Sequence, residues 1–384
     1  MKNQLKRCVN IQDLQKQAQR VLPSPVLGYL EGGADDEYSL NRNLSAYNSH
    51  ELIPRFLNDV SQVNTQINVL GTDIDIPLMI APTGMSRLFH EEAEFAVAKA
   101  AESVRTMYTL STVATESIES IANISKGPKM FQLYVFGDMG LNKEFIHRCK
   151  SAGYQALCLT VDVPTGGNRE RDIRTGMALP PKFTLESKLS LLTHPSWSIN
   201  RLFGKAFDLP NVSHLFDGED KDLSKRMNFI FKQLSPTVTW SDAEAMITEW
   251  DGPFAIKGIM SPSDARKAID IGASAIMVSN HGGRQLDTVP ATFDCLTDIV
   301  DAVNNRAEVI LDGGIRRGTD VLKALALGAK ACMIGRPYLY GLSLAGQAGV
   351  EHALNIFRSE IERDLALIGC SDICELDHTF IKRR

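Results

Sequence analysis

The sequence predicts one α/β domain spanning residues 1–384, a (β/α)8 TIM barrel with a helical segment before it and a long insertion after its fourth strand. Short β-rich runs recur eight times, most of them about 22 to 32 residues apart, which is roughly one strand and one helix each. Most runs are continuously apolar, as expected for parallel strands covered on both faces. A doubly wound sheet is the alternative, but it usually carries a G-x-G-x-x-G motif, which this chain lacks.

The predicted strands are apolar runs that end in polar residues. They are Leu78–Ala81, Thr106–Leu110, Met130–Tyr134, Ala156–Val161, Phe254–Lys257, Ala275–Val278, Glu308–Leu311 and Ala331–Ile334. Segments with helical periodicity lie between them, for example Ala93–Val104, Lys143–Ala152 and Val321–Ala326. Eight such units close a barrel, so residues 76–384 are predicted to form it and residues 1–75 to form a helical N-terminal segment.

One interval between strands is far too long for a single unit. From Asp162 to Phe254 the chain runs about 92 residues where a unit takes about 30, which predicts an insertion over about residues 177–235. Its centre, Lys182–Asp208, is rich in large apolar side chains and has more lysine and arginine than acidic residues. Three interpretations stay open: a lid over the active site, a surface that lies peripherally on a membrane, and a folded excursion that packs on its own barrel.

Composition restricts the partners and the location. The net charge of −5 gives no global basic field, which argues against nucleic acid as the main partner. No apolar run is long enough to cross a bilayer, and the basic first residues lack the apolar stretch of a secretory signal. The seven cysteines show no metal-like spacing, and Cys158 and Cys332 lie inside predicted strands. We therefore expect reduced thiols, no metal site and a cytoplasmic location.

Polar or charged side chains follow nearly every predicted strand. Because the active site of such a barrel gathers at the C-terminal ends of its strands, these side chains are expected to surround one mouth. They are Pro82-Thr83-Gly84, Ser111, Gln132, Tyr134, Thr160, Asp162, Lys257, Ser279, His281, Asp312-Gly313-Gly314 and Gly335-Arg336. Neutral donors and acceptors with one lysine suit a planar heterocycle with a polar edge, such as a flavin. A Schiff-base role for Lys257 is the other functional interpretation.

The most informative motif is the nonapeptide 279–287, Ser-Asn-His-Gly-Gly-Arg-Gln-Leu-Asp, which follows a predicted strand. Two glycines separate His281 from Arg284, and they let the backbone turn and a ligand approach closely. Histidine suits proton transfer near neutral pH, and arginine binds carboxylates with two parallel hydrogen bonds. The motif predicts a base and a carboxylate-binding cation in one cleft. An ordinary strand-to-loop junction with a hydrogen-bonded histidine is the alternative.

Glycine and arginine dominate the ends of the last two predicted strands. Asp312–Gly318 contains Gly313, Gly314 and Arg316, and Gly335-Arg336-Pro337 follows the eighth strand. Exposed backbone N–H groups beside an arginine at these two positions predict a phosphate-binding cradle, which is common after strands 7 and 8 of such barrels.

Motifs from nearly the whole chain resemble those of the FMN-dependent L-2-hydroxy acid dehydrogenase/oxidase family, which includes glycolate oxidase, L-lactate dehydrogenase and mandelate dehydrogenase. Each motif alone is unspecific, whereas the set is highly specific. The matching segments are Leu22-Pro23, Tyr29–Glu37, Ile80–Gly84, Phe131–Val135, Leu159–Asp162, Arg169–Asp172, Ile256–Gly258, the nonapeptide, Asp312–Asp320 and Ile334–Pro337. The family fold is a (β/α)8 barrel that holds FMN, in agreement with the strand pattern.

The resemblance implies a set of catalytic residues. His281 would be the base that takes a proton from the substrate's α-carbon or hydroxyl, and Asp162 would stabilise the resulting imidazolium. Tyr134 would contact the substrate hydroxyl or the developing oxyanion. Arg284 and Arg169 would bind the substrate carboxylate, and Tyr29 would add a hydrogen bond. Tyr29 packing only between helices, and Asp162 pairing only with Arg169, are the structural alternatives. Arg171 and Arg174 are interpreted as surface charges.

The resemblance also implies the cofactor contacts. Residues around the flavin ring and ribityl chain would be Pro82, Thr83, Gly84, Ser111, Gln132, Thr160, Lys257 and Ser279. The FMN phosphate would lie against Asp312, Gly313, Gly314, Arg316, Gly335 and Arg336. No metal takes part.

Two departures bear on substrate and acceptor. Val113 stands where glycolate oxidases carry a tryptophan, which leaves room for a larger substrate side chain, and Gly84 resembles the mandelate dehydrogenase pattern. The stretch Val163–Asp172 and the insertion resemble membrane-linked lactate and mandelate dehydrogenases. We therefore expect L-lactate oxidation to pyruvate with a quinone or protein electron acceptor, by a homo-oligomer that contacts the cytoplasmic face of the inner membrane through the insertion. An oxidase that releases hydrogen peroxide and a mandelate-type dehydrogenase are the alternatives.

Overall fold

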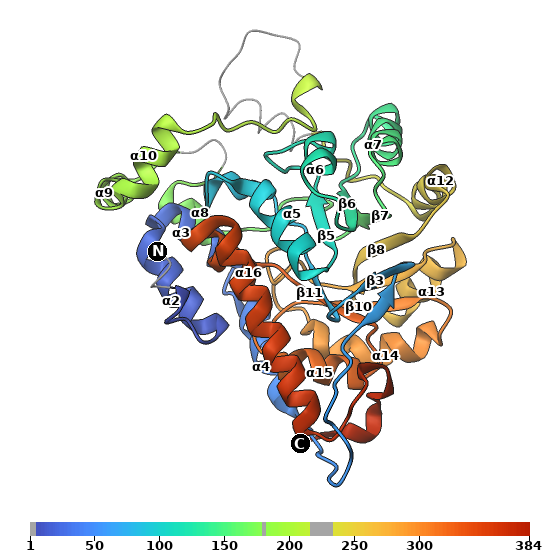
Figure 1. The fold of residues 1–384 in the computed structure, drawn as a ribbon. Coiled ribbons are helices and arrows are strands. Elements are labelled where there is room, and N and C mark those ends of the chain that lie inside the picture. The colour runs from blue at the N-terminus through green and yellow to red at the C-terminus, as the bar shows by residue number, and fades with distance from the viewer. Residues whose placement is uncertain (1–4, 179–181, 216–232) are drawn as a thin grey trace.

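The computed structural model describes residues 5–178, 182–215 and 233–384. Eight parallel strands close into a barrel in the order β10-β11-β4-β5-β6-β7-β8-β9, with helices around it (Figure 1). The strands are β4 (Leu78–Ile80), β5 (Tyr108–Ser111), β6 (Lys129–Leu133), β7 (Ala156–Thr160), β8 (Phe254–Ile259), β9 (Ala275–Val278), β10 (Glu308–Asp312) and β11 (Ala331–Ile334). The fold class predicted from the sequence is confirmed.

The strands are short and buried on both faces, which explains their continuous apolar pattern. Every predicted strand is present, and its ends differ from the prediction by at most about two residues. Cys158 and Cys332 are fully buried in β7 and β11, as expected of small core residues. β8 carries a bulge between Lys257 and Ile259, and it lies at a strand end that contributes to the mouth of the barrel.

Each barrel strand has a barrel helix after it along the chain, and the helices of the insertion precede the one after β7. The helices are α5 (Ala93–Val104), α6 (Ile118–Ile124), α7 (Met139–Ser151), α12 (Trp240–Trp250), α13 (Pro262–Asp270), α14 (Thr292–Val303), α15 (Gly318–Ala326) and α16 (Arg336–Leu367). α5 has the bounds predicted for it. α16 is kinked at Ala345 and Gly346 and runs beside α2 and α5 (Figure 1).

The N-terminal segment is only partly helical, so its prediction was incomplete. It contains α2 (Ile11–Val21), α3 (Ser24–Glu31), α4 (Tyr38–Ser45) and the 3-10 helix η1 (Ala46–Ser49), followed by β1 (His50–Leu52), β2 (Ile67–Val69) and β3 (Thr72–Ile74). β1 pairs with the C-terminal β12 (Ile381–Arg383). β2 and β3 form a hairpin around Leu70 and Gly71, both at positive φ as a tight hairpin turn requires. Strands of three residues are too short to show a periodic pattern.

The insertion between β7 and β8 packs on the barrel mouth over the part that the structure describes. It contains α8 (Glu170–Thr175), α9 (Leu185–Thr193), α10 (Pro195–Phe203) and η3 (Ser213–Leu215). Residues 179–181 and 216–232 of this region lie outside the described residues. Trp197 donates a hydrogen bond of 2.8 Å from Nε1 to the carbonyl of Leu88, and Lys205 forms an ion pair of 2.8 Å with buried Glu116. These contacts favour a folded segment that packs on its own barrel.

α9 and α10 project beyond α3 and α8 at the upper left of Figure 1. Within the described part of the chain, no helix has both the length and the apolar character needed to cross a membrane.

Candidate active site

A cavity of about 1050 Å³ opens at the C-terminal ends of the barrel strands, and residues from all eight strand ends line it. This volume is slightly above the usual range for small-molecule and cofactor sites, roughly 300 to 1,000 Å³. Every residue predicted for the site lines this cavity except Ser111, Asp162 and Ser279. Each of those three forms a hydrogen bond with a residue that does line it.

His281 and Asp162 form a hydrogen-bonded pair at the cavity wall. His281 Nδ1 lies 2.8 Å from Asp162 Oδ1, and the Tyr134 hydroxyl lies 3.5 Å from His281 Nε2. Burial acts to raise the pKa of Asp162, but the adjacent His281 lowers it overall. Asp162 is thus held as a carboxylate, and it fixes the imidazole so that Nε2 is the nitrogen available to a ligand. Gly258 makes this arrangement possible, because a Cβ there would lie 2.9 Å from that of Asp162.

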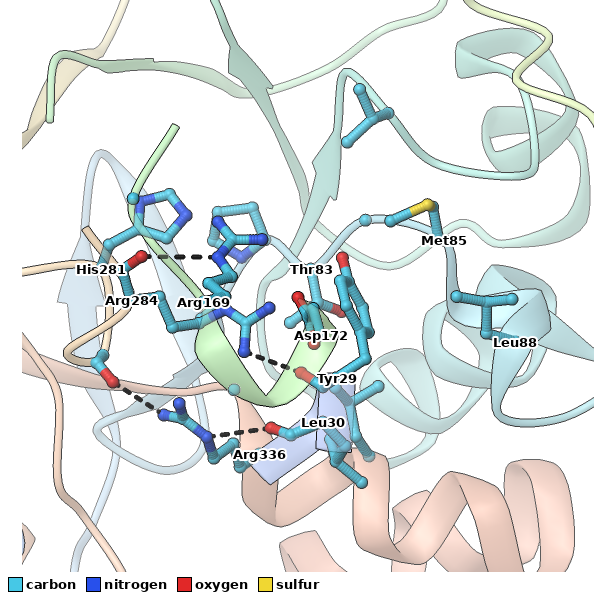
Figure 2. A pocket seen from close by; sticks show the side chains of 18 of the residues that line it. Tyr29, Leu30, Thr83, Met85, Leu88, Arg169, Asp172, His281, Arg284 and Arg336 are labelled. Carbon is cyan, nitrogen blue, oxygen red and sulfur yellow. Dashed lines mark hydrogen bonds between the residues drawn. The ribbon is translucent and has the colours of Figure 1, made fainter. Parts of the chain in front are cut away.

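Two arginines approach the same cavity from different segments (Figure 2). Arg284 donates from Nη1 to the carbonyls of Tyr29 (2.7 Å) and Gly32 (2.8 Å), and its guanidinium lies 4.9 Å from the centre of the Tyr29 ring. Arg169 donates to the Arg284 carbonyl at 3.4 Å and to the Gln285 side chain at 3.2 Å. Burial, with Arg169 adding to it, lowers the pKa of Arg284 to about 9, so the group remains cationic at neutral pH.

Tyr29 is more than a packing residue between helices. Its ring stacks on Phe89 at 6.3 Å and faces Arg284 across the cavity wall. Its position beside Arg284 at the cavity wall argues against the alternative in which Tyr29 packs only between helices.

Lys257 belongs to a buried polar triad with Ser279 and Asp312. Its Nζ donates to Asp312 Oδ2 at 2.5 Å and to Ser279 Oγ at 2.6 Å, and Ser279 Oγ donates to the same carboxylate oxygen at 2.8 Å. Burial acts to lower the pKa of Lys257, but Asp312 and Asp162 outweigh it and raise the pKa. An amine that stays protonated is a poor nucleophile, which argues against the Schiff-base interpretation.

Two polar atoms on the cavity wall have no hydrogen-bond partner among the described residues, Gln132 Nε2 and Thr160 Oγ1. Ser111 donates from Oγ to Gln132 Oε1 at 3.1 Å. This bond orients the amide and leaves Gln132 Nε2 available to a ligand. Since buried polar groups are nearly always hydrogen-bonded, these two atoms indicate a polar ligand at this part of the wall.

The glycine-rich ends of β10 and β11 form the opposite part of the cavity. Gly314 has φ +77°, and a Cβ there would lie 2.0 Å from the carbonyl of Asn43, so only glycine fits. Gly335 caps the N-terminus of α16, where free N–H groups and the helix dipole favour an anion. The Arg316 side chain also lines this region.

The Arg336 side chain does not extend into the open cavity, as a side chain that binds the phosphate would. It donates three hydrogen bonds of 3.0 Å, to the carbonyls of Leu30, Gly32 and Gly282. Figure 2 shows two of them, including the bond to Leu30. Arg336 thereby ties α3 to the loop after β9. The anion-binding capacity at this position thus comes from the main chain at the start of α16.

Comparison with known proteins agrees with this geometry. A family model described as FMN-dependent dehydrogenase matches residues 18–383. An L-lactate oxidase of Nostoc sp. is 42% identical over 377 residues, covering 97% of this chain and 98% of the relative. Glycolate oxidase 3 of Oryza sativa subsp. indica is 38% identical over 372 residues, covering 97% and 95%. The chain belongs to the FMN-dependent dehydrogenase family. As a member of it, the protein uses FMN to oxidise a 2-hydroxy acid.

A solved structure of the family has the same fold. The crystal structure of the monotopic membrane protein (S)-mandelate dehydrogenase superposes with a TM-score of 0.94 at 34% identity, covering 98% of this chain and 100% of that one. The cavity fits the family cofactor. The two orphaned donors and Lys257 suit the polar edge of a flavin, and the glycine cradle at β10 and β11 suits its phosphate.

Several residues that line the cavity were not predicted as site residues. Trp197 and Phe207 come from the insertion, and Leu88 comes from the turn after β4. Their sequence signal was ambiguous, because an apolar helix face does not reveal whether it will cover a cavity or meet a membrane. Asp172 also lines the cavity; it belongs to a segment that resembles the family, but its sequence context indicates no role for it.

Proposed function

We propose that this enzyme oxidises L-lactate to pyruvate and passes the electrons to a quinone or protein acceptor. The observation that carries the proposal is the convergence of the His281–Asp162 pair and two partly buried arginines on one cavity. A proton acceptor beside a carboxylate-binding pair is what a 2-hydroxy acid needs at its α-carbon and its carboxyl group. The 42% identity to an L-lactate oxidase supports lactate as the first substrate.

The substrate carboxylate would lie against Arg284 and Arg169. The carbonyls of Tyr29 and Gly32 occupy Nη1 of Arg284, which fixes the guanidinium plane. Among the described residues, no hydrogen bond uses its Nε or Nη2, so these two donors remain for a carboxylate. A guanidinium held in this way loses little conformational entropy on binding.

Proton transfer would involve His281 and Tyr134. His281 Nε2 accepts the proton that leaves the substrate's hydroxyl or α-carbon, and the Asp162 carboxylate stabilises the imidazolium. The Tyr134 hydroxyl, 3.5 Å from Nε2, reaches the substrate hydroxyl in the same space. FMN supplies the acceptor for the two electrons. Lys257 places a fixed positive charge at the cavity wall, which suits a cofactor that gains negative charge on reduction.

Anaerobic spectroscopy of the FMN-loaded enzyme tests the assignment. L-lactate is expected to bleach the flavin absorbance, whereas D-lactate, the matched control, leaves it unchanged. A panel of L-2-hydroxy acids with side chains from hydrogen to phenyl then ranks the substrates. If mandelate bleaches the flavin much faster than lactate does, the mandelate-type alternative replaces lactate. That outcome would agree with the space left by Val113 and Gly84, which both line the cavity.

An oxidase is the second candidate function, because the relatives at 38 to 42% identity are named oxidases. Turnover in air separates the two. Hydrogen peroxide released in equal amount to pyruvate would identify an oxidase. Slow turnover in air that a water-soluble quinone accelerates would support the dehydrogenase.

The insertion is proposed to touch a membrane surface. Its helices have two faces: Leu191 and Trp197 line the cavity, whereas Leu189, Leu192 and Leu202 are exposed by 61%, 77% and 75%. Exposed leucines in such number are unusual unless something covers them. A related structure is titled a monotopic membrane protein. Lys205 does not contribute a free positive charge to this surface, because it forms an ion pair with Glu116.

Vesicle co-sedimentation tests this contact. The double variant Leu189→Ser/Leu192→Ser is expected to lose binding to anionic vesicles and to keep FMN. Leu367→Ser is the matched control, because Leu367 is 65% exposed at the end of α16. Equal sedimentation of all three proteins would contradict the proposal. We also expect a homo-oligomer on the cytoplasmic face of the membrane, which light scattering of the detergent-free protein and cell fractionation check.

A further inference from the structure

Asp172 is a buried carboxylate on the wall of the active-site cavity. It is the only residue of α8 among those described whose side chain is buried, at 7% exposure. Figure 2 shows it among the side chains of Tyr29, Arg169 and Arg284, which line the same cavity. Among the described residues, its carboxyl oxygens take part in no hydrogen bond and no ion pair. Such a group is expensive to bury, so its presence needs a reason.

The fold does not supply that reason. The hydrogen bonds of Asp172 that hold α8 together come from its backbone, for example its N–H to the Arg169 carbonyl at 3.0 Å and its own carbonyl to the Met177 N–H at 2.8 Å. The carboxyl interacts electrostatically with Arg284 and Arg169 without contacting either one. Burial raises the pKa of Asp172, and the two arginines only partly offset this effect. The buried carboxylate of Asp172 thus does not stabilise the fold. It lies beside the two arginines where the substrate's own carboxylate is proposed to bind.

We propose that Asp172 sets the affinity of this site for anions. Its negative charge repels the substrate and product carboxylates at a distance and offsets part of the positive charge of Arg284 and Arg169. The inference rests on the proposed role of these arginines as the carboxylate site. Two guanidiniums alone would present two positive charges to a ligand with one negative charge. With Asp172 the net charge of these three side chains is one, which balances a monocarboxylate, so that the 2-oxo acid product leaves more readily.

The charge of Asp172 determines the direction and the size of the expected effect on anion affinity. A like charge held across one small cavity, at an effective dielectric constant of about 20, changes anion affinity by roughly tenfold or more. Asp172→Asn keeps the shape of the side chain and removes the charge. We expect the KM for L-lactate, and the Kd for pyruvate measured from the flavin spectrum, to fall roughly tenfold. The KM and Kd for the uncharged lactamide should stay within twofold of the wild-type values.

Two controls separate this effect from others. Glu170→Gln removes a carboxylate two residues away, which is 39% exposed and paired with Arg174, and it should leave all these values unchanged. Arg284→Met tests the proposed function separately, since it should abolish the preference for lactate over lactamide. If the preference survives in Arg284→Met, the carboxylate-site assignment fails whatever Asp172 does.

The outcome for Asp172 itself is decided by the ratio of acid to amide. A fall in KM and Kd confined to the anions supports the inference. Unchanged values, a rise for the anions, or equal changes for acid and amide overturn it, the last because they indicate a structural role. Removing a buried, unpaired charge should not destabilise the fold, and Asp172→Ser repeats the test if the asparagine variant does not accumulate.

Discussion

Replacing Asp162 by asparagine tests the most specific claim about the chemistry, that this carboxylate stabilises a protonated His281. The substitution keeps the size of the side chain and an oxygen that can accept the 2.8 Å hydrogen bond from Nδ1. It removes the negative charge, which the low pKa of Asp162 keeps in place. The step that suffers should be the one in which His281 gains a proton.

The magnitude follows from the geometry. With 2.8 Å between the bonded atoms, the centres of the two delocalised charges are about 4 Å apart, and their attraction at an effective dielectric constant of about 20 is about 4 kcal/mol. Since about 1.4 kcal/mol corresponds to a factor of ten, the rate of flavin reduction should fall about a thousandfold. Substrate affinity should change little, because the arginines are untouched.

Anaerobic stopped-flow mixing of the FMN-loaded variant with L-lactate measures both quantities. The limiting rate of bleaching reports the step, and its half-saturation reports affinity. Asp264→Asn is the control, because this aspartate is 44% exposed and pairs with Lys267. A decrease of less than tenfold in Asp162→Asn would contradict this role of Asp162, as would a loss that falls entirely on affinity.

Three further predictions concern stability. Lys257→Met leaves the buried Asp312 charge without its cationic partner and should cost about 3 to 5 kcal/mol of unfolding free energy, whereas Lys257→Met/Asp312→Asn recovers most of it; urea unfolding measures both. Gly314→Ala places a Cβ at positive φ against the Asn43 carbonyl and should lower stability by about 2 kcal/mol or more and weaken FMN retention, as thermal melts and flavin fluorescence will show. Because the folded state lowers the pKa of Asp162, its ionised form contributes stability above its ordinary value of 3.8 and loses that contribution as the pH falls through the folded value. The stability difference between wild type and Asp162→Asn should therefore shrink in urea titrations below pH 3.8.

The barrel, and the residues that surround its mouth, could be predicted from the sequence for one physical reason. Parallel strands covered on both faces are continuously apolar, so each strand end is marked by the first polar residue. Lys257, Ser279 and Asp312 are such residues, and the topology brings them together although they are far apart in the chain. The hairpin of β2 and β3 was missed because strands of three residues carry too little pattern.

Side-chain direction was beyond the reach of the sequence. Arg336 could be assigned to the mouth, but its donors turn to backbone carbonyls, which depends on how α3 packs. The insertion could be recognised by length alone, whereas the division of its leucines between cavity and surface depends on where α9 and α10 lie. Asp172 follows a run of charged residues, and nothing in that run distinguishes the one that is buried.

The most direct test of the whole account is the anaerobic rate of flavin bleaching by L-lactate in His281→Gln loaded with FMN. We expect a variant that retains its yellow colour and binds pyruvate like the wild type, yet bleaches slower by several orders of magnitude. Bleaching at a rate close to that of the wild type would show that the imidazole facing the cavity is not the base, and the chemistry assigned to this site would then be wrong.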